Sequence, residues 1–158
     1  MLGVQDFIGY YDWTFEYLRS NYGEAAVHAY WAKPNPHLLR LFSEQGFDGM
    51  YQHWRHTLEM EEAGYHLVQT DDYFRIDMPD CPSKGYLIRY GLAAYHDYCE
   101  HCIGWIKPLL DATGFVVHHE HNHMGQCYWE MHRADPAISH GETRPEPPPI
   151  RGAHDVRL

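Results

Sequence analysis

The sequence predicts an α+β domain in which helices pack against one face of an antiparallel sheet. Two observations lead to this prediction. Apolar and aromatic residues recur at helical spacing in the first part of the chain, and two later stretches are rich in aromatic and branched residues around short turns. A length of 158 residues is typical of one domain with a substantial core. We therefore expect one domain over residues 1–135 and a proline-rich tail over residues 136–158.

The N-terminal part is expected to consist of helices, because aromatic and apolar residues recur there every three or four positions. Turn-forming residues interrupt this pattern at Asn21–Gly23 and again at Pro34–Pro36. The expected helices span residues 5–20, 24–33, 36–45 and 48–63, and Gly64 ends the last of them.

The pattern changes to that of strands after the fourth helix. Residues 65–70 and 73–78 flank a pair of aspartates and predict a β-hairpin, and residues 115–123 and 127–133 predict a second hairpin. Between the hairpins, we expect a loop over residues 79–85 and one long central helix over residues 86–110. The inward stripe of this helix consists of Leu92, Tyr95, Cys99, Cys102, Ile106 and Leu109.

Composition and charge limit the classes of partner. The formal net charge is −10 and no run of lysine or arginine occurs, which argues against nucleic acid and anionic membranes. No stretch has the apolar length of a membrane span, and the N-terminus lacks the pattern of a signal peptide. We expect a cytoplasmic protein that binds a small molecule. Its tail has no periodicity and is expected to lie over the surface or to hold a second copy in a homodimer.

The four cysteines are the most informative residues. In a cytoplasmic chain they are expected to be thiols that serve a metal or catalysis rather than disulfides. Cys99 and Cys102 lie one helical turn apart on the inward stripe, where they are either small core residues or metal ligands. A redox role is disfavoured, because a redox CxxC pair lies at the start of a helix and this pair is expected two turns or more into one.

The second hairpin favours a metal site. Two thiolates from the helix, together with Cys127 and one histidine, would make a four-coordinate zinc site, and His123 is preferred because it lies at the turn. Strand alternation separates His119 and His121 from Glu120, but it does not decide which set faces inward.

Cys81 stands apart from the other cysteines, in the loop sequence DCPSKG beside Lys84. A nearby cation favours a thiolate, so Cys81 is a candidate nucleophile for a metal-free cysteine enzyme. The alternative is a loop cysteine without a chemical role.

The stretches DCPSKG, YCEHCIGWIKPLL and GQCYWEM resemble the L-2-amino-thiazoline-4-carboxylic acid hydrolase-like family over residues 65–133. The same region is similar in outline to the V4R small-molecule-binding domain. That similarity implies zinc held by Cys99 or Cys102 together with Glu120, His123 and Cys127. The extra helix cysteine and a shorter gap before Cys127 depart from the V4R pattern. These two departures leave open whether Glu120 is a metal ligand or acts in acid–base catalysis.

These observations support more than one function. The first is a metal-dependent hydrolase that acts on a C–N bond of a small heterocyclic or amide-like substrate. In it, zinc or another divalent metal activates water, and Glu120, His119 or His121 moves the proton. The second is a V4R-like small-molecule-binding domain with a structural zinc, and the third is a metal-free enzyme that uses Cys81. Three protein ligands would favour catalysis, and four would favour a structural metal.

Overall fold

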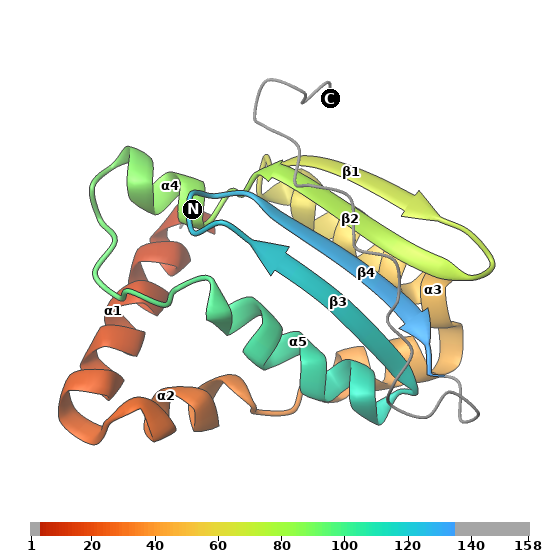
Figure 1. Ribbon diagram of the computed structural model, residues 1–158, viewed down its shortest axis with the longest axis horizontal. Coiled ribbons are helices and arrows are strands. Elements are labelled where there is room, and N and C mark those ends of the chain that lie inside the picture. Colours follow the sequence, from red (N-terminus) through yellow and green to blue (C-terminus); the bar gives the residue numbers. More distant parts are fainter. Residues whose placement is uncertain (1–3, 135–158) are drawn as a thin grey trace.

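The computed structural model describes residues 4–134 and confirms the α+β class (Figure 1). The helices α1 (Val4–Tyr22), α2 (Glu24–Trp31) and α3 (Pro36–Met60) precede the hairpin of β1 (Gly64–Gln69) and β2 (Tyr73–Asp80). The short helix α4 (Lys84–Arg89) and helix α5 (Glu100–Ala112) then lead to the hairpin of β3 (Phe115–His121) and β4 (Cys127–Arg133). The tail, for which we expected a role in a homodimer, lies outside the described residues.

The strands form one antiparallel sheet in the order β1–β2–β4–β3. The two predicted hairpins are joined along β2 and β4, where Ile76 is paired with Trp129. In Figure 1, α3 lies against β1 and β2, and α5 runs along β3, while α1 and α2 lie beyond α5. Because β3 is an edge strand, its side chains are reachable from the side as well as from the two faces of the sheet.

Two buried clusters hold these layers together. The larger lies between the sheet and the helices α3 and α5, and contains Phe42, Phe74 and Trp129. The smaller joins α1 and α2 to the segment around Tyr95 and Tyr98, which packs against Phe15. Within residues 4–134, no helix combines the length and the apolarity that a membrane span needs.

The helices predicted over residues 36–45 and 48–63 form one element, α3, with a kink. Gly46 lies at the kink with φ 55° and ψ −129°, a conformation that residues with a side chain rarely adopt. At the start of α3, the side chain of Asn35 accepts a hydrogen bond from the backbone N–H of Leu38 at 3.2 Å.

The prediction of one long helix over residues 86–110 is wrong. The chain leaves the helical path at Gly91, where φ is 65°, and the N–H of Leu92 donates to the carbonyl of Leu87 at 2.9 Å. This arrangement is typical of a helix that ends at a left-handed glycine. Leu92, which was expected on the inward stripe, is exposed.

A carboxylate of α1 holds the next segment in its non-helical path. Asp12 is fully buried and accepts the backbone N–H groups of Ala94 at 2.6 Å and Tyr95 at 3.0 Å. A second helix therefore begins only at Glu100, with Cys99 at its N-cap position. The cysteine pair lies in the first turn of α5, so the reason for disfavouring a redox role no longer holds.

Candidate functional site

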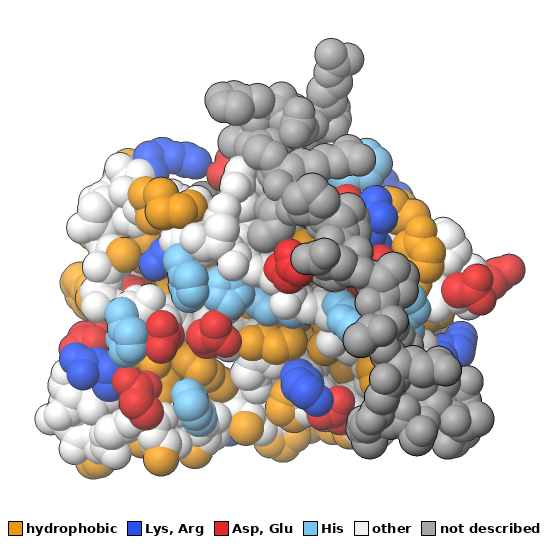
Figure 2. Space-filling view, viewed as in Figure 1, with side chains coloured by type: hydrophobic (Ala, Val, Ile, Leu, Met, Phe, Trp, Pro, Cys, Tyr) orange, Lys and Arg blue, Asp and Glu red, His pale blue; other side chains and the backbone are white. Residues whose placement is uncertain are grey.

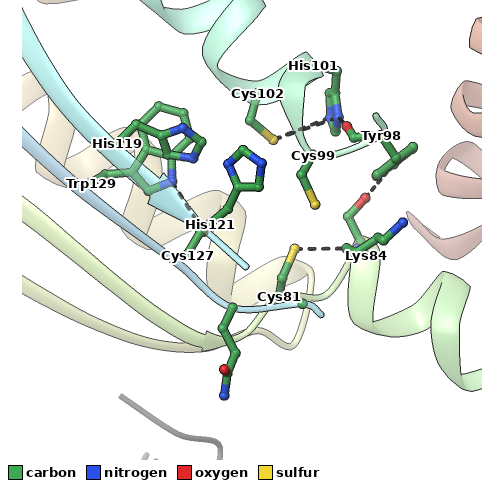
Figure 3. A pocket seen from close by; sticks show the side chains of 13 residues that line it. Cys81, Lys84, Tyr98, Cys99, His101, Cys102, His119, His121, Cys127 and Trp129 are labelled. Atoms are coloured by element: carbon green, nitrogen blue, oxygen red, sulfur yellow. Dashed lines mark hydrogen bonds between the residues drawn. The ribbon is translucent and has the colours of Figure 1, made fainter. Parts of the chain in front are cut away.

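The four cysteines, which come from three separate segments of the sequence, line one small cavity of about 30 Å³. They come from the loop after β2, the first turn of α5 and the start of β4 (Figure 3). All four are free thiols. We call this space the thiol cavity and define it by Cys81, Cys99, Cys102 and Cys127.

The register of the sheet and two close turns place these sulfurs. Cys127 is paired with His121 of β3 and with Met78 of β2. The N–H of Cys81 donates to the carbonyl of Gly125 at 2.7 Å, which ties the loop after β2 to the turn between β3 and β4. Gly125 has φ 87°, and a Cβ at this position would lie 3.1 Å from the backbone of Gly85 in the first turn of α4. The close approach of this turn to α4 therefore favours glycine.

Two of the four sulfurs accept hydrogen bonds from N–H groups. Cys81 Sγ accepts from the N–H of Lys84 at 3.4 Å, and Cys127 Sγ accepts from Trp129 Nε1 at 3.3 Å. Burial raises the pKa of all four thiols, to about 11 for Cys99 and well above the usual value for Cys102. Without a base or a bound cation, these groups are thiols and not thiolates at neutral pH.

Three other side chains converge at the edge of the thiol cavity. His121 Nε2 lies 3.1 Å from Glu100 Oε1 and 3.1 Å from His123 Nε2. Among residues 4–134, these three form the group whose ligand atoms all lie within 4.8 Å of one another. His123 lies at the turn with φ 57°, a left-handed conformation, and its ring contacts that of His121. We call Glu100, His121 and His123 the Glu–His–His triad.

Glu100 and His121 of the triad line a groove of about 560 Å³ between α5 and β3. Lys107, His119 and Glu120 also line the groove, and Lys107 pairs with Asp111 at 2.6 Å. Figure 2 shows histidine and acidic side chains gathered where the end of β3 meets the start of α5. The groove is open to solvent and presents both charged and neutral polar groups.

The histidines of β3 that share a face with the thiols are held in the uncharged form. His119 lies against Trp129 with ring centres 3.9 Å apart, and burial lowers its pKa to about 3. Burial also lowers the pKa of His121, and Glu100 opposes this effect. Neutral imidazoles are the form that binds a metal.

A larger apolar cavity of about 410 Å³ adjoins the thiol cavity on its other side. The two cavities share Cys81, Cys102, Cys127 and His101. Aromatic side chains from α1, α3, α5 and β4 form much of the remaining lining; they include Tyr11, Trp54, Trp105 and Trp129.

The structure divides the predicted site residues between two neighbouring places. Cys81, Cys99, Cys102 and Cys127 meet at the thiol cavity, although Cys81 was expected to stand apart. The remaining candidates lie along β3 and its turn. His119 and His121 line both the thiol cavity and the groove, whereas Glu120 lines only the groove. His123 belongs to the triad. Sequence reasoning missed Glu100 and His101, which lie between the two cysteines of the CEHC sequence.

Comparisons with known proteins found no match: no family model, no curated protein and no solved structure corresponds to this chain. The family resemblance described above therefore stays a prediction.

Proposed function

We propose that the protein is a metal-dependent hydrolase of a small molecule, with a divalent metal bound by the Glu–His–His triad. The observation that supports this proposal most directly is the convergence of Glu100, His121 and His123, with all ligand atoms within 4.8 Å. Two histidines and one carboxylate are the ligands of catalytic zinc sites and of several iron sites. Three protein ligands leave positions open for water and substrate, which is the arrangement that favours catalysis.

The ligands differ from the set predicted from sequence. His123 is common to both, but Glu100 and His121 take the places of the three cysteines. This exchange follows from the start of α5 at Glu100, which directs this carboxylate toward β3, whereas Cys102 lines the cavity.

The groove supplies the other groups that hydrolysis requires. A bound divalent metal would lower the pKa of a water ligand and so supply the nucleophile. Glu120 is an exposed carboxylate that lines the groove, and we propose it as the group that accepts or returns a proton. Lys107 is a cation of the groove and would exchange its pairing with Asp111 for an anionic substrate group, which suits the 2-aminothiazoline carboxylate class that the family resemblance implies. We propose cleavage of a C–N bond in such a substrate.

Metal titration tests the proposal. Chelator-treated full-length protein is titrated with Zn²⁺ and separately with Mn²⁺ in a calorimeter, and one ion per chain is expected to bind. Glu100→Gln and His121→Ala should each weaken binding by about 10-fold or more, since each removes a ligand. His66→Ala, on the exposed part of β1, is the matched control and should bind normally.

Two outcomes decide against this site. Binding that survives in His121→Ala but is lost in Cys127→Ser would assign the metal to the thiol cavity, as the structural-zinc alternative requires. No binding of either ion would reject the metal-dependent function altogether. Where binding is found, turnover of L-2-aminothiazoline-4-carboxylate, followed by chromatography with and without added metal, tests the reaction.

A further inference from the structure

The apolar cavity has the size and the access of a binding site for a small organic molecule. Its volume of about 410 Å³ lies within the range of small-molecule sites. Phe7 of α1 and Trp105 of α5 line the cavity and are also exposed to solvent, so they lie at its opening. The chemistry of the lining residues therefore indicates which kind of molecule the cavity suits.

The walls of the cavity include aromatic rings that other side chains hold in place. The ring centre of Trp54 lies 5.3 Å from that of Phe42 and 5.7 Å from that of Phe74. Tyr11 is stacked on Phe15 with ring centres 6.1 Å apart. Rings that are already fixed contact a ligand at little cost in side-chain ordering, and aromatic rings attract cations as well as apolar groups.

One carboxylate lies within this aromatic lining. Among the described residues that line the cavity, Glu61 is the only acidic one, and none is lysine or arginine. Glu61 follows the last turn of α3, and burial alone raises the pKa of its carboxyl group, which agrees with the absence of a nearby cation. Burial raises the pKa of Cys81, and the charge of Glu61 adds to this effect. The carboxylate therefore lies toward the end of the cavity that contains this thiol.

Other polar side chains of the lining have partners inside the protein and do not neutralise this carboxylate. Thr57 Oγ1 donates to the carbonyl of His53 at 3.1 Å, and the hydroxyl groups of Ser83 and Tyr98 are bonded to each other at 2.5 Å. Burial lowers the pKa of His53, so its imidazole is uncharged at neutral pH. A carboxylate without a partner is unfavourable in apolar surroundings, and a cationic ligand would relieve this cost at Glu61.

We propose that the apolar cavity binds an organic cation, in which an ammonium group is attached to an apolar or aromatic body. Glu61 is the counter-ion of the ammonium group, and the rings of Trp54, Tyr11 and Trp105 contact the alkyl and aryl carbons of the ligand. The net charge of −10 favours the approach of such a cation to the protein.

This site is separate from the proposed metal centre. Glu100, His121 and His123 do not line the apolar cavity, and Glu61 does not line the groove. The metal proposal expects an anionic substrate, whereas the apolar cavity favours a cation. Binding of the cation requires no metal, so it can be measured in the presence of a chelator, and failure of either proposal leaves the other standing.

Two probes of equal shape test the need for charge. The cation is 3-hydroxyphenyltrimethylammonium, and its neutral counterpart is 3-tert-butylphenol, in which carbon replaces the charged nitrogen. Full-length protein in chelator is titrated with each probe at pH 7 in a calorimeter. One cation per chain should bind, at least about 10-fold more tightly than the neutral probe, because desolvated cation–ring contacts and the ion pair act on the charged probe alone.

Variants locate the bound cation. Glu61→Gln keeps the shape of the side chain and should weaken binding of the cation by about 10-fold or more while leaving the neutral probe unaffected. Glu62→Gln is the matched control, because it removes the same charge from the next residue, which is exposed and does not line the cavity. Trp105→Ala, at the opening, should also weaken binding, and Trp13→Ala, an exposed tryptophan of α1 outside the cavity, should not.

Three results would overturn the proposal. They are failure of the cation to bind, binding of the neutral probe as tight as that of the cation, and equal affinities of the Glu61→Gln and Glu62→Gln variants for the cation. Circular dichroism establishes that each variant is folded. If Glu61→Gln does not fold, the comparison of the two probes on the wild-type protein and the pair of tryptophan variants decide.

Discussion

Single residues in the first turn of α5 have different surroundings although they are adjacent in sequence. Glu100 meets the histidines at the end of β3 and its turn, and the ring of His101 packs at a tilt against Phe15 and Tyr98. Cys102 lines the thiol cavity. The sequence predicted that both cysteines face inward, and both line this cavity. It could not predict Glu100 or His101 as site residues, because their directions depend on where the helix starts.

The strand histidines show a second limit at the residue scale. Alternation correctly separates His119 and His121 from Glu120, but both Val116 and Val117 are apolar and do not indicate the inward face. The structure decides it through the pairing of His119 with Trp129 and of His121 with Cys127. The turn that joins β3 to β4 contains Gly125, which lies against the backbone of Gly85 and accepts a hydrogen bond from Cys81, both distant in sequence.

Glu120→Gln separates the two roles that the sequence left open for Glu120. The side chain lines the groove but is not a member of the triad. We expect the variant to bind metal with wild-type affinity and to turn over substrate about 10²-fold more slowly, because the amide cannot accept a proton. Calorimetry and a turnover assay on the same preparation measure both quantities. Loss of metal would make Glu120 a ligand, and normal turnover would transfer the proton-moving role to His119.

At the scale of elements, the hairpins and N-terminal helices could be predicted, whereas the break between α4 and α5 could not. The hairpins depend on local patterns of branched and aromatic residues. The break depends on the hydrogen bonds that Asp12 accepts from the N–H groups of Ala94 and Tyr95, which are 82 and 83 positions further along the chain. A local periodicity of three to four residues contains no information about such a distant acceptor, and Gly91 alone is tolerated within many helices.

The contact between α2 and α5 gives a test at this scale. A Cβ at Gly104 would lie 2.8 Å from Trp31 Cε3, a distance that real contacts do not reach. Gly104→Ala should therefore destabilise the protein by about 1–3 kcal/mol through overpacking, despite the better helix propensity of alanine. Urea denaturation measures the change in the free energy of unfolding.

Gly9→Ala is the matched control, since Gly9 lies within α1 and has no atom within 4 Å of the added carbon. It should stabilise the protein by about 0.5–1 kcal/mol. Equal effects of the two substitutions would show that α2 and α5 do not pack as closely as described.

At the scale of the whole molecule, the α+β class followed from patterns, but the placement of the site required the complete topology. The pairing of β2 with β4 brings the loop after β2 beside the turn between β3 and β4. The start of α5 meets both. The loop after β2, the turn between β3 and β4, and the start of α5 thus form the thiol cavity together. The spacing of the cysteines in the sequence does not indicate that these three segments lie side by side.

Buried neutral histidines predict how the whole molecule responds to acid. His53 is half-buried beside Phe42 and Trp54, and burial lowers its pKa, with a further effect of His37 and His56. The unfolded chain therefore binds more protons than the folded one as the pH falls below about 6.5, and the free energy of unfolding falls with it. For each such histidine, the free energy of unfolding falls by less than about 1.4 kcal/mol per pH unit, which is the limit for one proton. The slope is smaller than this limit because the side chain keeps some contact with water.

His53→Phe tests this dependence. The substitution keeps an aromatic ring and removes the titratable group, so the free energy of unfolding should fall less steeply between pH 7 and pH 5. Urea denaturation in chelator, at several pH values, measures the slope without a contribution from metal binding. An identical slope in the variant would mean that His53 is protonated as readily in the folded protein as in the unfolded chain.

The position of residues 99–102 in one helical turn limits which changes of sequence the site can tolerate. Successive residues of a helix point about 100° apart. Removal or insertion of one residue within residues 99–102 would therefore turn the carboxylate away from the histidines and the thiol away from its cavity in a single event. Point substitutions, by contrast, alter one of these contacts at a time. We expect an insertion or deletion within residues 99–102 to abolish metal binding and the shape of the thiol cavity together, whereas a single substitution there should affect one of them.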